Sequence, residues 1–180
     1  MKTLRFLILL LPLLQCFSAC SGGNGPVRRQ TAAIDTVFTH ARVRTYGRYY
    51  KGLDMKVVSL DLYSKALLTD GDTTGGSGTN LWFSDIFIDT TDTFLPEAEY
   101  TIDSLPQLHS ALPALTFDGL MTGSCLIQVV DGQVQDLTGF SDGRFTVRYE
   151  GDTAVMDFRL TTASQRTYHG VYRGVPVYEP

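Results

Sequence analysis

The strongest constraint on the fold is a period-two alternation of apolar and polar residues near the C-terminus. Residues 145–150 alternate in this way, a Gly151-Asp152 pair follows, and the alternation resumes over residues 154–160. Successive side chains of a strand point to opposite faces, and a Gly-Asp pair between two such runs is typical of a hairpin turn. The pattern predicts two antiparallel strands with one apolar and one charged face.

Similar alternation, or a short apolar run between turn residues, recurs along the chain and predicts an all-β fold. A polar loop is expected over residues 69–79, and an irregular stretch with room for one helical turn over residues 104–115. About eight or nine strands are expected, at residues 36–46, 58–63, 81–88, 99–102, 125–130, 133–137, 145–150, 154–160 and 167–172. Their number and spacing favour an antiparallel β-sandwich or a flattened lipocalin-like barrel.

The first twenty residues have the order of a secretory signal peptide. Lys2 and Arg5 form a positive start, residues 6–14 are an apolar run interrupted only by a proline, and small residues precede Cys20. The apolar run is about half of the roughly 20 residues that a membrane-spanning helix needs. We therefore expect residues 1–19 to be removed from the mature protein.

The cleavage region resembles the lipobox of bacterial lipoproteins. Small residues lead into Cys20, although Phe17 stands where that motif usually has Leu. The resemblance implies a diacylglycerol on Cys20, and Ser21 after it is compatible with delivery to an outer membrane, on either face. The alternatives are cleavage near Ala19 without lipid and lipidation at Cys16, which the polar Gln15 before it disfavours.

Residues 20–33 are expected to be a tether, and residues 34–180 a single all-β domain. The tether begins with Gly, Asn and Pro residues and has no apolar periodicity. Removal of the signal peptide takes two basic residues away, so that 13 Lys and Arg face 19 Asp and Glu and the net charge becomes −6. Nucleic acid is therefore not an expected partner. Cys125 remains as the one unmodified thiol, and its strand-like surroundings predict a buried, inert side chain.

A broader resemblance covers most of residues 38–172. The stretches at residues 46–52, 60–63, 96–102 and 143–170 are similar to a recurring pattern in small all-β lipoproteins of Bacteroidetes. The resemblance implies an all-β architecture and an extracytoplasmic location, and it transfers no catalytic residue.

The motifs that could carry chemistry are weak. Asp70 and Asp72 begin a segment like a calcium loop, but Leu81 stands where the closing Glu belongs, so we expect a solvated loop. The three histidines are scattered, and neither a zinc site nor any cofactor is expected. Asp85 and Asp89 are candidate paired carboxylates for glycoside hydrolysis, with Asp92 close by in the sequence. We predict no catalytic residue for the leading hypothesis.

Four aromatic residues are the candidate ligand-binding set. Tyr46, Tyr49 and Tyr50 stand close together among arginines, and Trp82 follows in a later strand. Exposed rings can stack on sugar faces, although tyrosines are often simply half-buried at sheet edges. The leading hypothesis is a lipid-anchored, extracytoplasmic binding or scaffolding module of the outer membrane, with a glycan or an envelope protein as its partner. The alternative is a small glycan-acting hydrolase of the cell envelope.

Overall fold

A computed structural model describes residues 31–33, 37–64, 67–70 and 73–180 of the chain. The described residues contain no helix, and none of them forms an apolar helix of membrane-crossing length. The strands are β1 (Thr31–Ala33), β2 (Phe38–Gly47), β3 (Lys56–Ser64), β4 (Leu67–Asp70), β5 (Thr73–Gly76), β6 (Gly78–Ile88), β7 (Ala98–Ile102), β8 (Ser110–Ala111), β9 (Leu115–Phe117), β10 (Leu120–Thr122), β11 (Ser124–Val130), β12 (Gln133–Gly139), β13 (Asp142–Glu150), β14 (Thr153–Thr161), β15 (Thr167–Gly174) and β16 (Val177–Glu179).

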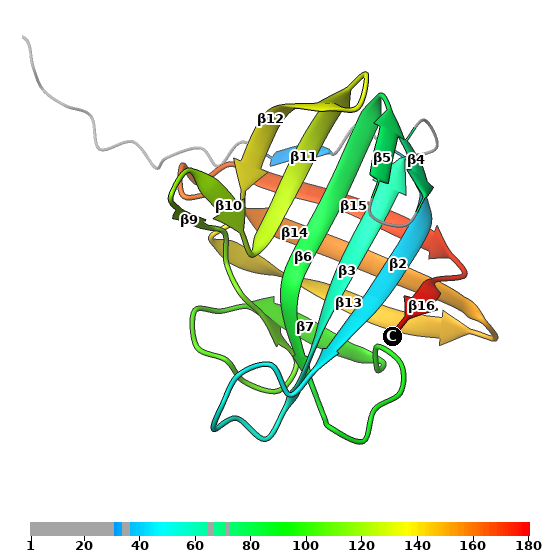
Figure 1. Cartoon of the computed structure of the whole chain (residues 1–180), viewed down its shortest axis with the longest axis vertical. Helices are drawn as coiled ribbons and strands as arrows, with labels where there is room; N and C mark the ends of the chain where they lie inside the picture. The colour runs from blue at the N-terminus through cyan, green and yellow to red at the C-terminus, as the bar shows by residue number, and fades with distance from the viewer. Residues whose placement is uncertain (1–30, 34–36, 65–66, 71–72) are drawn as a thin grey trace, which may run out of the picture.

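Eight of these strands close into a barrel (Figure 1). Around the barrel the order is β2, β3, β6, β8, β7, β13, β14 and β15, and β15 returns to β2 at the pair Tyr172 and Phe38. The barrel form of the predicted all-β fold is therefore confirmed, and the sandwich form is not. The β7–β8 and β15–β2 pairings are parallel, so the barrel is mixed rather than wholly antiparallel.

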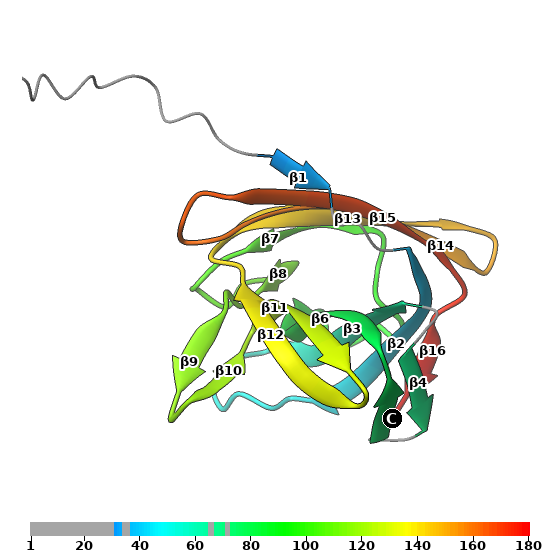
Figure 2. The same ribbon diagram turned by 90° about the horizontal axis from the view of Figure 1, so that it is seen from above.

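Two bulged pairings help the sheet to bend into a closed form. The β2–β3 register shifts after Phe38 and again after Thr45, and the β3–β6 register shifts after Val58. An extra residue in one strand of a pair increases the local bend and twist. Strand β6 also uses one edge twice, because its first half pairs with β11 and its second half with β8. The β11–β12 hairpin therefore projects beyond the ring of eight strands (Figure 2).

Side chains fill the interior of the barrel. The ring of Phe145 lies 4.6 Å from that of Phe83 and stacks at 4.8 Å on Tyr100, measured between ring centroids. Leu60, Leu81 and other aliphatic side chains from the surrounding strands complete one continuous core. Because close-packed side chains occupy the interior, the surfaces that can receive a ligand lie on the outside of the barrel and at its ends.

Three segments contain strands that the sequence did not predict. Residues 69–79 were expected to form a loop, but β4 and β5 pair as a hairpin there and β6 begins at Gly78. The stretch at 104–115 is mostly irregular, as expected, and contains the short strand β8. The last residues of the expected tether form β1, which pairs in parallel with the start of β15. In each case backbone hydrogen bonds to a neighbouring strand make the strand, and these need no apolar periodicity.

Candidate functional site

The three predicted tyrosines come together where β2 ends and the chain turns towards β3. The ring of Tyr49 lies 6.5 Å from that of Tyr46 and 5.2 Å from that of Tyr50, at angles of 63° and 83°. Tyr46 and Tyr49 are 45% and 67% exposed. Gly47 supports the turn with a φ of 63°, a value that favours glycine. Because neighbouring rings are steeply inclined, the three together do not make one flat platform for a sugar.

Tyr50 connects this cluster to the barrel. Its ring packs 5.6 Å from Phe87, and its hydroxyl donates a hydrogen bond of 2.9 Å to Oδ1 of Asp85. The hydroxyl of Ser84 donates to the other oxygen of the same carboxylate at 2.5 Å. Burial, and then the bond to Asp85, raise the pKa of Tyr50 to about 12. The Asp85 carboxylate therefore holds the tyrosine loop against β6.

Trp82 does not join the tyrosines. It lies opposite Asp61 of β3 and Cys125 of β11, and it is half-buried. Burial raises the pKa of the Asp61 carboxyl, although Asn80 donates a hydrogen bond of 3.1 Å to it. The sequence-based set of four aromatic residues therefore divides into a tyrosine cluster and a separate tryptophan in the middle of a sheet.

The carboxylates of the hydrolase hypothesis form local hydrogen bonds. Oδ1 of Asp89 accepts from the backbone N and the hydroxyl of Thr91, at 2.8 and 2.6 Å, and these bonds lower the pKa of Asp89. Oδ2 of Asp92 accepts from the backbone N of Asp89 at 3.1 Å. A general acid in glycoside hydrolysis needs a raised pKa, so Asp89 is unsuited to that role. Together with the engaged Asp85, these contacts favour structural roles for the carboxylates.

The other sequence candidates are placed as follows. Cys20 lies outside the described residues, as does Asp72 in the segment that resembles a calcium loop. Within the described residues, no three His, Cys, Asp or Glu side chains converge on a point that could hold a metal. Cys125 is fully buried, which confirms the predicted burial, and burial raises its pKa to about 12, which favours an unreactive thiol.

A pocket that the sequence did not predict lies beside the turn between β13 and β14. Its volume is about 420 Å³, within the range typical of small-ligand sites. Three aromatic residues and one acid contribute to its lining, and no basic residue does. The complete lining is Phe94, Tyr149, Gly151, Asp152, Val175, Pro176 and Tyr178. We call this the aromatic pocket.

Two tyrosine hydroxyls fix the geometry of the aromatic pocket. Tyr149 donates a hydrogen bond of 2.9 Å to the carbonyl oxygen of Leu95, and its oxygen lies 2.6 Å from the hydroxyl of Tyr178. A carbonyl can only accept, so the single proton of Tyr149 is used there and Tyr178 must donate to Tyr149. Burial raises the pKa of Tyr149, so its hydroxyl keeps the proton that it donates to Leu95.

The C-terminal segment forms one wall of the aromatic pocket and is held by an ion-pair network. Strand β16 pairs in parallel with β2, and Glu179 bridges Arg42 and Arg44 at 3.2 Å each. The side chain of Arg42 is only 12% exposed, so this pair is weakly screened. The carboxylate partner of both arginines therefore comes from the chain itself.

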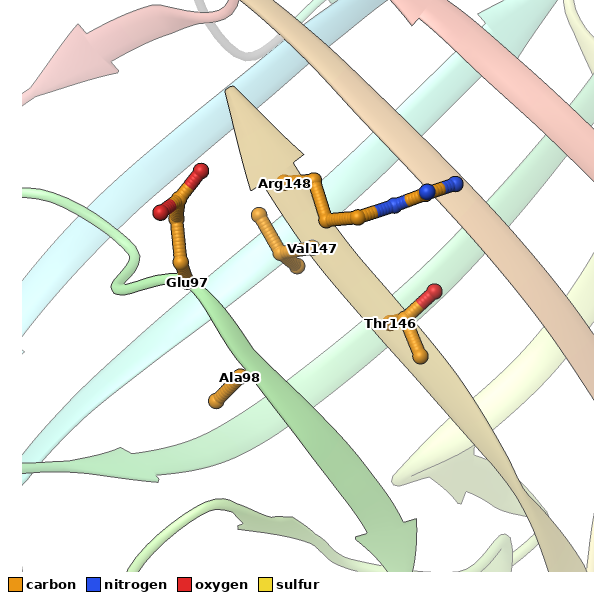
Figure 3. A pocket seen from close by; sticks show the side chains of 5 residues that line it. All are labelled: Glu97, Ala98, Thr146, Val147 and Arg148. Carbon is orange, nitrogen blue, oxygen red and sulfur yellow. The ribbon is translucent and has the colours of Figure 1, made fainter.

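A second hollow of about 380 Å³ lies where β7 begins beside β13 (Figure 3). The carboxylate of Glu97 accepts a hydrogen bond of 2.6 Å from the backbone N of Tyr149, and Arg148 binds Asp157 at 2.7 Å. Figure 3 shows that the side chains of Glu97 and Arg148 point in different directions. Because both charged groups are engaged separately, this hollow is a weaker candidate than the aromatic pocket.

The residues of the aromatic pocket escaped sequence analysis because they are far apart along the chain. Phe94 lies in a loop, Tyr149 looks like an ordinary inward residue of β13, and Tyr178 stands near the C-terminus. The Val175-Pro176 step after the last predicted strand was the one local signal of a further element. Comparisons of the chain with protein-family models, with curated proteins and with solved structures find no match.

Proposed function

We propose that this protein is a lipid-anchored binding module of the outer membrane, attached through Cys20, which binds its ligand in the aromatic pocket. The observation that carries the binding role is the combination of a filled barrel interior with an aromatic pocket at one end. A rigid scaffold that presents a few side chains on its loops is a common design for binding proteins. A glycan or an envelope protein remains the partner class predicted from the sequence.

The path of the chain supports this arrangement. Strand β1 enters beside Thr167, at the start of β15, whereas the pocket residues Val175 and Pro176 follow its end at Gly174. Eight residues of extended chain span about 25 Å. Figure 1 shows β1 and β16 towards opposite ends of β15. A lipid tether that leads into β1 would therefore leave the aromatic pocket on the side of the barrel away from its attachment.

Metabolic labelling with a palmitate analogue tests the anchor. The parent should be labelled and found in the membrane fraction, and Cys20→Ala should carry no label. Cys16→Ala is the matched control, because it removes the neighbouring cysteine of the signal region, and it should be labelled like the parent. Persistent label on Cys20→Ala, or loss of label from Cys16→Ala alone, would refute attachment at Cys20.

A further inference from the structure

We propose that the aromatic pocket binds an alkylated ammonium cation, such as the trimethylammonium group of choline. This inference rests on the proposed function, because it takes the aromatic pocket to be the binding site. It goes further in naming the chemical class of the ligand from the rings and charges that line the pocket.

The rings provide surfaces that attract a cation. Phe94 and Tyr178 meet edge to face, with centroids 5.0 Å apart and planes inclined at 77°, so their faces form a corner. Tyr149 contributes a third ring to the lining. The face of an aromatic ring is electrostatically negative, and recognition of quaternary ammonium groups by several rings is a recurrent use of this property. A methylated ammonium also buries apolar methyl groups against the rings.

The oxygens of the pocket add negative potential. Since Tyr178 donates its proton to Tyr149, the remaining lone pairs of its oxygen can face positive charge. Asp152, in the turn after β13, is a lining residue and brings a negative charge close to the pocket. A quaternary ammonium has no N–H to donate, so rings and a nearby carboxylate satisfy it without a closely matched set of acceptors.

Two arginines that lie close in the sequence to lining residues of the aromatic pocket are already paired with carboxylates. Arg173 binds Glu150 at 2.5 Å, and Arg148 binds Asp157 at 2.7 Å. Neither arginine lines the aromatic pocket, and a cation entering it meets no basic lining residue. The whole chain has a net charge of −4, which gives a cation no general electrostatic barrier to approach.

Titration of the full-length protein, held in a maltoside detergent, tests the proposal with choline and its uncharged isostere 3,3-dimethylbutan-1-ol as probes. Choline should bind about tenfold more tightly than the isostere, because the two share a shape and differ in charge. Phe94→Ala should weaken choline binding about tenfold, and Asp152→Asn should weaken it severalfold. Phe94 is 59% exposed, so its removal leaves the core intact.

Phe117→Ala is the matched control, because Phe117 is a 75% exposed ring on β9 and does not line the pocket. It should bind choline like the parent. Equal affinity for choline and its isostere, absence of choline binding at millimolar concentration, or an unaffected Phe94→Ala variant would overturn the proposal. Labelling at Cys20 is measured separately, so a negative choline result would leave the proposed lipid attachment unaffected. If neutral sugars bind and Phe94→Ala weakens their binding, the pocket is a binding site but the proposed cationic ligand is wrong.

Discussion

The buried hydroxyl of Tyr172 has no hydrogen-bond partner among the described residues, so replacement of Tyr172 by Phe should stabilise the protein. The side chain is 1% exposed. Its hydroxyl oxygen lies against Gly174, where an added Cβ would be only 2.5 Å away. Folding therefore removes this hydroxyl from water without replacing its hydrogen bonds.

The expected gain follows from the cost of burying an unpaired polar group. That cost is about 1–3 kcal/mol, while removal of one oxygen atom from a packed site loses a smaller amount of contact energy. We expect Tyr172→Phe to raise the free energy of unfolding by about 1 kcal/mol. For a domain of this size, that corresponds to a rise in Tm of about 2–4 °C.

Urea unfolding followed by the fluorescence of Trp82 measures the change, with an unchanged slope showing that the unfolded state is unaffected. Tyr149→Phe is the matched control, because the hydroxyl of Tyr149 has two partners and its loss should destabilise by about 1 kcal/mol. The two substitutions remove the same atom and should act in opposite directions. A Tyr172→Phe variant less stable than the parent would show that the hydroxyl is hydrogen-bonded, for example to a buried water, and would refute the reasoning.

Four further predictions concern other parts of the molecule. Burial raises the pKa of Tyr50 and Tyr172 from 10.0 to about 12. Between these pH values the folded state keeps protons that the unfolded state has lost, so the free energy of unfolding should be at its full value below pH 10 and should fall towards pH 12. Unfolding followed by circular dichroism measures this, and a free energy of unfolding that does not change between pH 10 and 12 would contradict it. Gly143→Ala should lower the free energy of unfolding by about 3 kcal/mol or prevent folding, because the φ of Gly143 is 138° and an added Cβ would lie 2.5 Å from the carbonyl oxygen of Arg159. An unchanged urea midpoint would contradict this prediction. Glu179→Gln should accelerate amide hydrogen exchange in β16 and leave that of β14 unchanged, because the Glu179 carboxylate binds two arginines of β2. Equal exchange in the parent and the variant would show that Glu179 does not anchor β16. Cys125 should react with a thiol reagent only after unfolding, and rapid reaction in the native state would show that it is accessible.

The sequence predicted the parts of the fold that depend on local pattern. Alternation over residues 145–160 produced the β13–β14 hairpin as expected, because the period of side-chain direction in a strand is set by the backbone alone. The burial of Cys125 followed from the same local reasoning. The polar segment at 69–79 was misjudged, since the pairing of β4 with β5 depends on backbone hydrogen bonds and not on an apolar pattern.

The candidate binding surfaces were harder to predict. Tyr46, Tyr49 and Tyr50 were expected to meet because they are neighbours in the sequence, and they do. Trp82 is separated from them by its place in the middle of a sheet. Phe94, Tyr149 and Tyr178 form the aromatic pocket although long stretches of chain lie between them, and their meeting depends on how the barrel closes.

By itself, the sequence determined an all-β chain with a predicted lipid anchor at Cys20, because strand periodicity and a signal motif are read over a few adjacent residues. The tertiary structure alone decided between a sandwich and a barrel, through the single pairing of Tyr172 with Phe38. It also formed the aromatic pocket proposed as the binding site, by holding β16 against β2 through Arg44 and Glu179, which are 135 positions apart. Such contacts depend on the packing of the whole chain, so local pattern does not determine them.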